Sequence, residues 1–275
     1  MKRLAFLSVL AAAALAVPAT AGKPITVKGS DTMVILGQRW AEKYMNAHAG
    51  QVIMVTGGGA GTGIAALING TTEICQSSRS MKQDEKLKLR DRYQTMGVEI
   101  PVAKDGLAVY VHSGNALKEL TVEQLRRIYQ GTITNWKDVG GKDATIILYG
   151  RENSSGTYGF FKEHVLQNKD FSARVQTLPG TAAVVNAVSK DPNGIGYGGA
   201  AYAKGVREVA IKKDAQSPAV LPTAEAVKDN SYPLSRPLFY YLRKQPAGDT
   251  KKFVDWILSP EGQKLAVEVG YFPLN

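Results

Sequence analysis

The sequence predicts an α/β protein. Short β-like runs alternate with amphipathic helical segments along nearly the whole chain, which is the pattern typical of this class. Three of the predicted strands pass into helices through small, polar turns that contain glycine or serine. The 275 residues are enough for one large or two medium domains, and no repeat, low-complexity tract or linker marks a boundary between them.

The first residues are expected to be removed from the mature protein. Lys2 and Arg3 precede an apolar run over residues 4–17 that is too short to span a membrane comfortably. Ala19-Thr20-Ala21 then has the form of a signal-peptidase site. We therefore expect a signal peptide over residues 1–21 and a soluble protein in the periplasm or elsewhere outside the cytoplasm. An uncleaved membrane anchor is the alternative.

Charge and cysteine content narrow the possible functions. The net charge of +10 suits an anionic partner, whether a small anion, a nucleic acid or a lipid surface. Lysine and arginine are spread along the chain without a basic cluster interleaved with aromatic residues, which argues against nucleic acid. Cys75 is the only cysteine, so no internal disulfide can form, and we expect it to be a small buried side chain in a strand.

The first part of the chain predicts strands over residues 25–28, 52–56 and 73–76. The segment after the first strand predicts a helix with one apolar face, because its large apolar residues are spaced three and four apart. These residues are Met33, Leu36, Trp40 and Tyr44. A second helix follows the second strand and carries Ile64, Leu67 and Ile68.

The rest of the chain continues the alternation. Thr121 opens a helix, because Gln124 stands three residues further on and completes a capping box. The last helix begins at Ser259-Pro260 and ends at Gly270, which are good start and stop residues. The remaining predictions are strands over residues 107–112, 145–149, 194–197 and 238–242, and helices over residues 155–167 and 182–189.

Three strand-to-helix turns are suited to an oxyanion: Gly29–Thr32, Gly57–Gly63 and Ser155–Thr157. A helix start offers unpaired N–H groups and the positive end of the helix dipole, and hydroxyl side chains add donors. Any one such turn also serves as an ordinary helix cap. Arg151 makes the third turn the best candidate for an anion site, because its planar guanidinium matches two oxygens of a tetrahedral anion. Gly156 permits the backbone to approach the anion closely.

Nothing in the sequence predicts a catalytic residue, a metal site or a cofactor. His48, His112 and His164 are isolated and lack the spacing of metal ligands. The glycine-rich stretch Gly57–Gly63 is not a P-loop, because no Gly-Lys-Ser/Thr ends it.

Arg151 together with Ser155-Gly156-Thr157 resembles the anion-binding segment of the periplasmic phosphate-binding proteins of the ABC transport system. The resemblance covers nearly the whole mature chain and implies a two-lobed, type II periplasmic-binding fold whose lobes close over the anion. The other segments that carry the resemblance are Gly29-Ser30-Asp31-Thr32, Gly57–Gly63, Ser77-Ser78-Arg79, Lys104-Asp105-Gly106-Leu107-Ala108-Val109, Gly131-x-x-x-Asn135-Trp136 and Ile195-Gly196-Tyr197.

The resemblance also implies which residues bind phosphate, with two departures from the family pattern. The second loop commonly has a serine where this chain has Ala60. In one branch of the family, the third loop has an aspartate that accepts the phosphate proton, at the position that Ser78 occupies here. Asp31 and Asp105 are the candidates to replace that acceptor. The expected ligand-binding residues are Ser30, Asp31, Thr32, Ala60, Ser78, Arg79, Asp105, Arg151, Ser155, Gly156 and Thr157.

The function implied is the capture of inorganic phosphate and its delivery to the permease subunits of an ABC transporter, by a monomer that binds no nucleic acid. We expect residues 23–104 with 237–275 to form lobe 1 and residues 105–236 to form lobe 2, joined by crossover strands near 102–109 and 235–242. The alternatives are another tetrahedral oxyanion such as sulfate, molybdate, tungstate or arsenate, a phosphatase on the same scaffold, and a sensing or adhesion role without transport.

Overall fold

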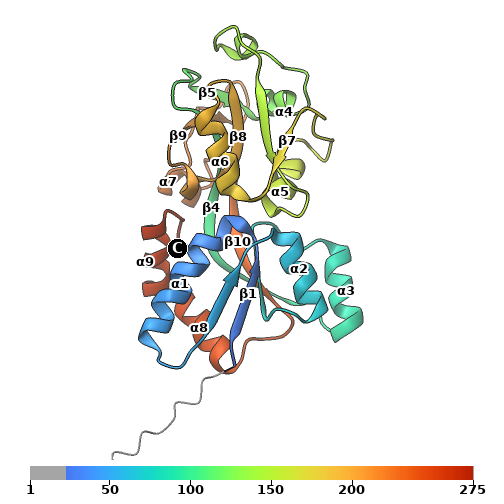
Figure 1. The fold of residues 1–275 in the computed structure, drawn as a ribbon, viewed down its shortest axis with the longest axis vertical. Coiled ribbons are helices and arrows are strands. Elements are labelled where there is room, and N and C mark those ends of the chain that lie inside the picture. Colours follow the sequence, from blue (N-terminus) through green and yellow to red (C-terminus); the bar gives the residue numbers. More distant parts are fainter. Residues whose placement is uncertain (1–22, 275) are drawn as a thin grey trace, which may run out of the picture.

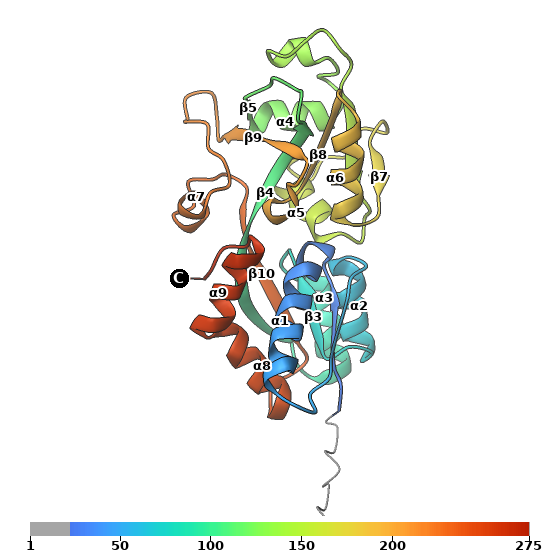
Figure 2. The same ribbon diagram turned by 60° about the vertical axis from the view of Figure 1, so that its left-hand side comes forward.

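The structure is a computed structural model that describes residues 23–274, so the predicted signal peptide lies outside the described residues. The chain forms two α/β lobes, one above the other in Figure 1, which we call lobe 1 and lobe 2. Two long strands, β4 (Val98–His112) and β10 (Ser235–Leu242), run between them, as Figure 2 shows from a second side. The predicted α/β class is confirmed.

Lobe 1 holds both ends of the described chain. Its elements are β1 (Ile25–Gly29), η1 (Asp31–Met33), α1 (Val34–Ala47), β2 (Ile53–Thr56), α2 (Ala60–Asn69), β3 (Ile74–Ser77), α3 (Gln83–Tyr93), α8 (Gly248–Leu258) and α9 (Pro260–Val269). Lobe 2 contains β5 (Glu119–Thr121), α4 (Val122–Tyr129), η2 (Trp136–Val139), β6 (Ile147–Arg151), α5 (Gly156–His164), β7 (Gln176–Leu178), α6 (Gly180–Lys190), β8 (Gly194–Gly199), η3 (Ala200–Tyr202), β9 (Val206–Lys212) and α7 (Ala224–Lys228).

One curled sheet passes through both lobes in the strand order β2-β1-β3-β10-β4-β8-β6-β7. Residues 98–106 of β4 pair with β10, whereas residues 107–111 pair with β8. The chain therefore enters lobe 2 along β4 and returns to lobe 1 along the antiparallel β10. The strands β1, β2 and β3 are parallel, so their carboxyl ends share one edge of the sheet.

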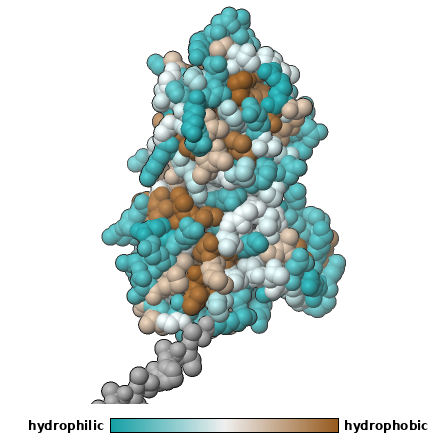
Figure 3. Space-filling view, viewed as in Figure 1, coloured by the Kyte–Doolittle hydropathy of each residue, from teal (hydrophilic) through white to brown (hydrophobic). Residues whose placement is uncertain are grey.

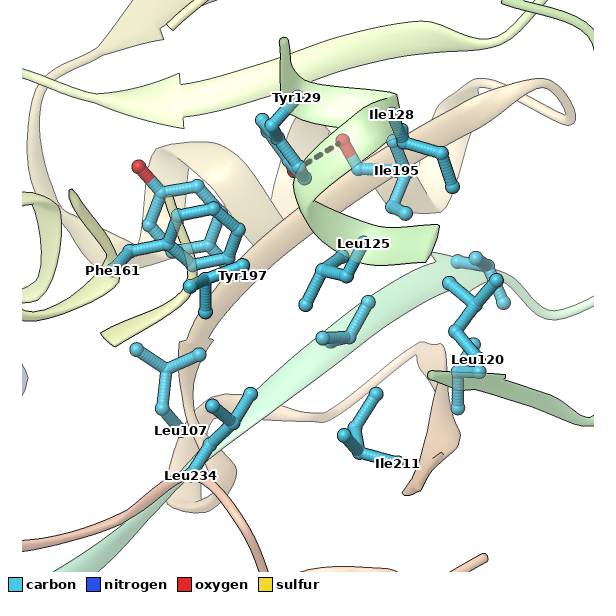
Figure 4. Close-up of a cluster of buried hydrophobic side chains, with 14 of the residues drawn as sticks. Leu107, Leu120, Leu125, Ile128, Tyr129, Phe161, Ile195, Tyr197, Ile211 and Leu234 are labelled. Atoms are coloured by element: carbon cyan, nitrogen blue, oxygen red, sulfur yellow. Dashed lines mark hydrogen bonds between the residues drawn. The ribbon is translucent and has the colours of Figure 1, made fainter. Parts of the chain in front are cut away.

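Each lobe has its own hydrophobic core. The core of lobe 1 draws on residues 25–103 and 238–271, and that of lobe 2 on residues 107–234. Figure 4 shows part of the second core, where Tyr129 packs near Phe161 and Tyr197 and its hydroxyl donates to the Ile195 carbonyl. Full burial of each large apolar side chain contributes about 1.5–3 kcal/mol, so the core of each lobe can hold the loops at its edge in place.

The predicted apolar face of the first helix is confirmed, because Met33, Leu36, Trp40 and Tyr44 are all buried. The capping box of Thr121 and Gln124 is present at α4, and Cys75 is buried in β3. The last helix ends before Gly270, which has a φ of 100°.

Other elements differ from the prediction. The helix predicted over residues 155–167 ends at His164, and Gln167 and Asn168 then adopt positive φ angles. The strand predicted to begin at Leu107 begins at Val98. The sequence did not predict α3, because that helix is mostly charged and buries only Leu89. It also did not predict the short elements β5, β7 and α7, nor β9.

The outer surface on the face drawn in Figure 3 is largely hydrophilic, with brown areas of limited extent. Large apolar side chains that are exposed belong to different elements, which is ordinary for a folded surface. Among residues 23–274, no helix is long and apolar enough to cross a membrane.

Candidate functional site

The predicted binding loops meet where the two lobes touch. Parallel strands bring their carboxyl ends to one edge of a sheet, and ligands of open α/β sheets bind beyond that edge. In lobe 1 the turns after β1, β2 and β3 lie at this edge, and in lobe 2 the turn between β6 and α5 faces them. Loops far apart in the sequence therefore share one location.

Six buried polar residues form a continuous network at this junction, which we call the cleft network: Ser30, Thr32, Ser78, Asp105, Thr157 and Arg236. The Ser30 hydroxyl donates to Ser78 Oγ at 2.7 Å, and Thr32 Oγ1 lies 2.9 Å from Thr157 Oγ1. Arg236 donates to Thr157 Oγ1 at 3.1 Å, to the Ser78 carbonyl at 3.3 Å and to Asp105 Oδ2 at 2.7 and 2.9 Å. None of the six is more than 3% exposed.

Glycines allow the starts of α2 and α5 to touch across the junction. A Cβ on Gly156 would lie 2.9 Å from the Ala60 Cβ and 2.6 Å from Ser78 Oγ. A Cβ on Gly59, whose φ is 91°, would lie 2.5 Å from the Ser154 carbonyl oxygen, to which the Gly61 N–H donates at 2.8 Å. The lobes are therefore closed on each other, with two helix starts directed at the same buried region.

Ser155 is the N-cap of α5, and its hydroxyl accepts from the N–H groups of Thr157 and Tyr158. The first N–H of α5, that of Gly156, has no acceptor within the helix, and the same holds for Ala60 at the start of α2. Both N–H groups remain as donors at the positive ends of the helix dipoles. The site is thus rich in directed donors.

Arg151 is the last residue of β6, and its side chain is only 1% exposed. Its guanidinium donates to Asp31 Oδ2 of lobe 1 at 2.8 Å, to both Glu152 oxygens and to Thr181 Oγ1 at 2.9 Å. Partial burial raises the pKa of Glu152, but the hydrogen bonds and charge of Arg151 outweigh this, and the net pKa is lowered. Arg151 therefore joins the two lobes through an ion pair.

Most of the predicted site residues lie at this junction. Ser30, Thr32, Ser78, Asp105 and Thr157 belong to the cleft network, while Ala60, Ser155 and Gly156 form the touching helix starts. Asp31 and Arg151 form the ion pair beside them. Arg79 lies next to Ser78 with its stem against Gly159 of α5, and its guanidinium makes two hydrogen bonds to Glu85, at 2.7 and 2.8 Å.

Sequence reasoning missed Arg236 and Thr181, which are 3% and 1% exposed. Arg236 stands at the start of β10, directly opposite Asp105 of β4 in the antiparallel pairing. A signal was present, because both strands were predicted as crossovers, and where they pass between the lobes one carries Asp105, next to Lys104, and the other carries Arg236. Two such residues of opposite sign in neighbouring strands are expected to pair.

Carboxylates outnumber arginines at the junction. Asp31, Glu152 and Asp105 accompany only Arg151 and Arg236. Burial raises the pKa of Asp105, and this effect outweighs the lowering by the charge and hydrogen bonds of Arg236. The side chains at this junction supply no net positive charge, so an anion placed here would depend on N–H and O–H donors as well as on the two arginines.

Glu208 lies in β9, paired with Tyr110 of β4, and its Oε1 is buried without a hydrogen-bond partner among residues 23–274. Burial, with a smaller contribution from the charge of Asp105, raises the pKa of Glu208 to about 7. This carboxyl group therefore titrates near neutral pH in the folded protein.

The free energy of unfolding is expected to decrease as the pH rises through about 7. Glu208 keeps its proton up to about pH 7 when folded but loses it near pH 4.5 when unfolded. The stabilisation from this group is complete below pH 4.5 and lost as the pH rises through 7. Thermal unfolding of wild type and Glu208→Gln between pH 4 and 8 checks this. The same dependence of melting temperature on pH in both proteins would contradict it.

No group of three or more histidine, cysteine, aspartate or glutamate side chains in the described part of the chain is arranged to hold a metal ion. The cleft network contains hydroxyl, carboxylate and guanidinium groups but no histidine or cysteine. The arrangement is suited to holding an oxyanion through many hydrogen bonds.

Comparison with known proteins gives a consistent result. The family model of the PBP superfamily domain matches residues 16–261. A phosphate-binding protein PstS of Pseudomonas aeruginosa is 35% identical over 263 residues, which cover 90% of this chain and 81% of the relative. The phosphate-binding protein PstS of Staphylococcus haemolyticus is 35% identical over 254 residues, 89% of this chain and 79% of the relative.

Solved structures resemble the whole fold. A crystal structure from Clostridium perfringens, described as a phosphate ABC transporter substrate-binding protein with bound phosphate, has a TM-score of 0.84 at 30% identity and covers 92% of this chain and all of its own. An ABC-type phosphate transport receptor from Vibrio cholerae has a TM-score of 0.73 at 30% identity, covering 90% of this chain and 99% of the receptor.

Proposed function

The chain belongs to the PBP superfamily and, within it, to the PstS phosphate-binding proteins, and from this premise we propose that it captures inorganic phosphate between its two lobes and delivers it to an ABC permease. The observation that carries the proposal is the cleft network, in which polar side chains from both lobes and both crossover strands are buried together. A buried region lined by hydroxyl, carboxylate and guanidinium groups offers hydrogen-bond partners to a polar ligand and none of the apolar surface that an apolar ligand needs.

The proposed binding groups come from three sources. Hydroxyl groups of the cleft network and the N–H groups of Ala60 and Gly156 surround the anion, and Arg151 supplies charge. Closure through hinge strands is the usual way in which two-lobed binding proteins enclose a ligand. We assign residues 23–104 with 237–275 to lobe 1 and 105–236 to lobe 2, with β4 and β10 as the hinge. Arg79 is omitted from the binding groups, because Glu85 holds its guanidinium.

Asp105 is the better candidate for the acceptor of the phosphate proton. It is 1% exposed and belongs to the cleft network, whereas the Asp31 side chain is 18% exposed and lies beside Arg151. Both Asp31 oxygens are already used, by the Gly58 N–H at 2.8 Å and by Arg151. A buried carboxylate accepts a hydrogen bond from hydrogen phosphate but repels fully ionised sulfate, which offers no proton. This favours phosphate over sulfate, molybdate and tungstate.

We further propose reversible binding without a covalent step, by a monomer located outside the cytoplasm. The relatives are named as binding proteins, and the junction lacks a histidine or cysteine that would serve as an activated nucleophile or its base. A phosphatase remains the second candidate function, and turnover of p-nitrophenyl phosphate that is lost in a cleft variant would favour it.

Calorimetry of the mature protein tests the ligand. We expect phosphate to bind at pH 5 and at pH 8, and sulfate to bind at least about 30-fold more weakly at both values. The difference corresponds to about 2 kcal/mol, the cost of leaving a buried acceptor opposite a ligand with no proton. Asp105→Asn should narrow the gap, because an amide repels sulfate less.

The same titration can contradict the proposed ligand or the proposed acceptor. Sulfate, molybdate or tungstate binding more tightly than phosphate would contradict the assignment of the ligand. A selectivity that is unchanged in Asp105→Asn would instead show that the discriminating group is another residue, with Asp31→Asn as the next variant to measure.

A further inference from the structure

Arg236 lies where both lobes and both hinge strands meet. It begins β10 and pairs with Asp105 of β4, and its guanidinium also reaches the carbonyl of Ser78 in lobe 1 and the hydroxyl of Thr157 in lobe 2. The guanidinium carbon lies 5.3 Å from the centre of the Phe160 ring, which packs against it from the lobe 2 side. One side chain thus contacts both walls of the cleft.

The hydrogen-bond count shows what Arg236 can still bind. A guanidinium has five N–H groups in a fixed plane. Nε and Nη2 donate to Asp105 and Thr157, and Nη1 donates to Ser78, which accounts for four of them. The second Nη1 N–H has no acceptor among residues 23–274. It belongs to a side chain that is 3% exposed, so water outside the protein does not readily satisfy it.

The ion pair with Asp105 determines the position of this remaining donor. Asp105 Oδ2 accepts from both Nε and Nη2, which fixes the plane of the guanidinium. The two residues stand opposite each other in β4 and β10, so the plane is anchored to the hinge itself. The contacts to Ser78 and Thr157 come from different lobes, and both are made together when the lobes are closed.

On the basis of the proposed function, we propose that Arg236 is a second anion-binding arginine, which donates its remaining Nη1 N–H to the bound phosphate and thereby links ligand binding to closure of the hinge. Arg151 approaches from the edge of lobe 2, whereas Arg236 approaches from the hinge. A lysine does not replace it, because a point charge cannot hold Asp105, both walls and the ligand in one plane.

The test uses the mature protein with Arg236→Lys and, as a matched control, Arg243→Gln. Arg243 follows directly after the same strand, and its Nη1 donates to the carbonyls of Leu67 and Thr72, away from the cleft network. Calorimetry with inorganic phosphate is expected to show an affinity loss of at least tenfold for Arg236→Lys and less than threefold for Arg243→Gln. The melting temperature without phosphate separates loss of fold from loss of binding.

A second variant tests the same role if Arg236→Lys does not fold. Asp105→Asn with Arg236→Gln replaces the ion pair by a neutral amide pair and leaves no buried charge unpaired. Because Asp105 is itself a proposed ligand group, the reference is Asp105→Asn alone, relative to which the double variant should lose at least a further tenfold in phosphate affinity while remaining folded. In addition, ¹⁵N spectra of the wild-type arginine side chains should show a phosphate-dependent change at Arg236, a reading that needs no variant.

The outcomes separate the two proposals. If the wild type binds no phosphate, the proposed function fails. If the wild type binds phosphate but a folded Arg236→Lys or double variant loses less than tenfold, the role of Arg236 is wrong. An Arg236 resonance that stays unchanged at phosphate saturation would also overturn it. A lower melting temperature with wild-type affinity would show a structural role only.

Discussion

Replacing Arg151 by alanine is expected to weaken phosphate binding by about 3 kcal/mol, or roughly 150-fold, as is typical when one partner of a buried charge pair is removed. Arg151 is 1% exposed and holds Asp31 of lobe 1 and Glu152 of lobe 2 together. Without it, two carboxylates face each other beside the anion site, and the ion pair that joins the lobes is lost. The variant therefore repels the anion and at the same time loses stability of the closed state.

Calorimetry with inorganic phosphate measures this effect. The control is Arg127→Ala, which removes the same charge from an exposed position on α4 of the same lobe. The control should retain wild-type affinity within about twofold, because screened surface charges contribute little. Wild-type affinity in Arg151→Ala would mean that the arginine serves only to join Asp31 and Glu152, and that the anion takes its charge partner elsewhere.

Gly156→Ala is expected to hold the lobes apart. The added methyl group would lie 2.9 Å from the Ala60 Cβ and 2.6 Å from Ser78 Oγ, and both neighbours belong to lobe 1. Gly156 is the first residue of α5, where alanine is tolerated at least as well as glycine, so the open form of the protein should be no less stable. Overpacking of the closed junction costs about 1–3 kcal/mol, which predicts a loss of phosphate affinity of roughly 5- to 150-fold.

Small-angle scattering with saturating phosphate and calorimetry check the prediction together. Gly159→Ala is the matched control on the same helix, because its methyl group would meet only the Arg79 side chain, at 3.1 Å from Cδ. That flexible stem can shift, so the control should lose less than threefold in affinity. Equal radii of gyration for liganded Gly156→Ala and wild type would show that the junction tolerates the methyl group.

Much of the fold could be predicted from local sequence patterns. The apolar face of α1, the capping box at Thr121 and the start of α9 at Ser259-Pro260 are each set by residues within a few turns of one another. The helix α3 was not readable, because its single buried residue Leu89 leaves no apolar period to detect. Periodicity finds a helix only where one face is buried along its length.

Part of the candidate site, like part of the fold, could be predicted from the sequence. The turns at Gly29–Thr32, Gly57–Gly63 and Ser155–Thr157 were found from hydroxyl and glycine residues at the ends of predicted strands, the turn at Ser78 came from the family resemblance, and the structure brings all four to one junction. The sequence thereby determined a set of donors suited to an oxyanion. It could not determine how the charged side chains are shared among them, because that depends on the partners that folding supplies.

What the tertiary structure decided is the pairing of charges. Arg236 meets Asp105 across 131 residues of sequence, and Arg151 meets Asp31 across 120, because β4 and β10 run antiparallel and the lobes close on each other. The guanidinium of Arg79, another predicted site residue, pairs with Glu85 of the neighbouring helix. Local sequence determines where a helix starts and which donors it presents, but the geometry of hinge and closure determines which charges reach the anion.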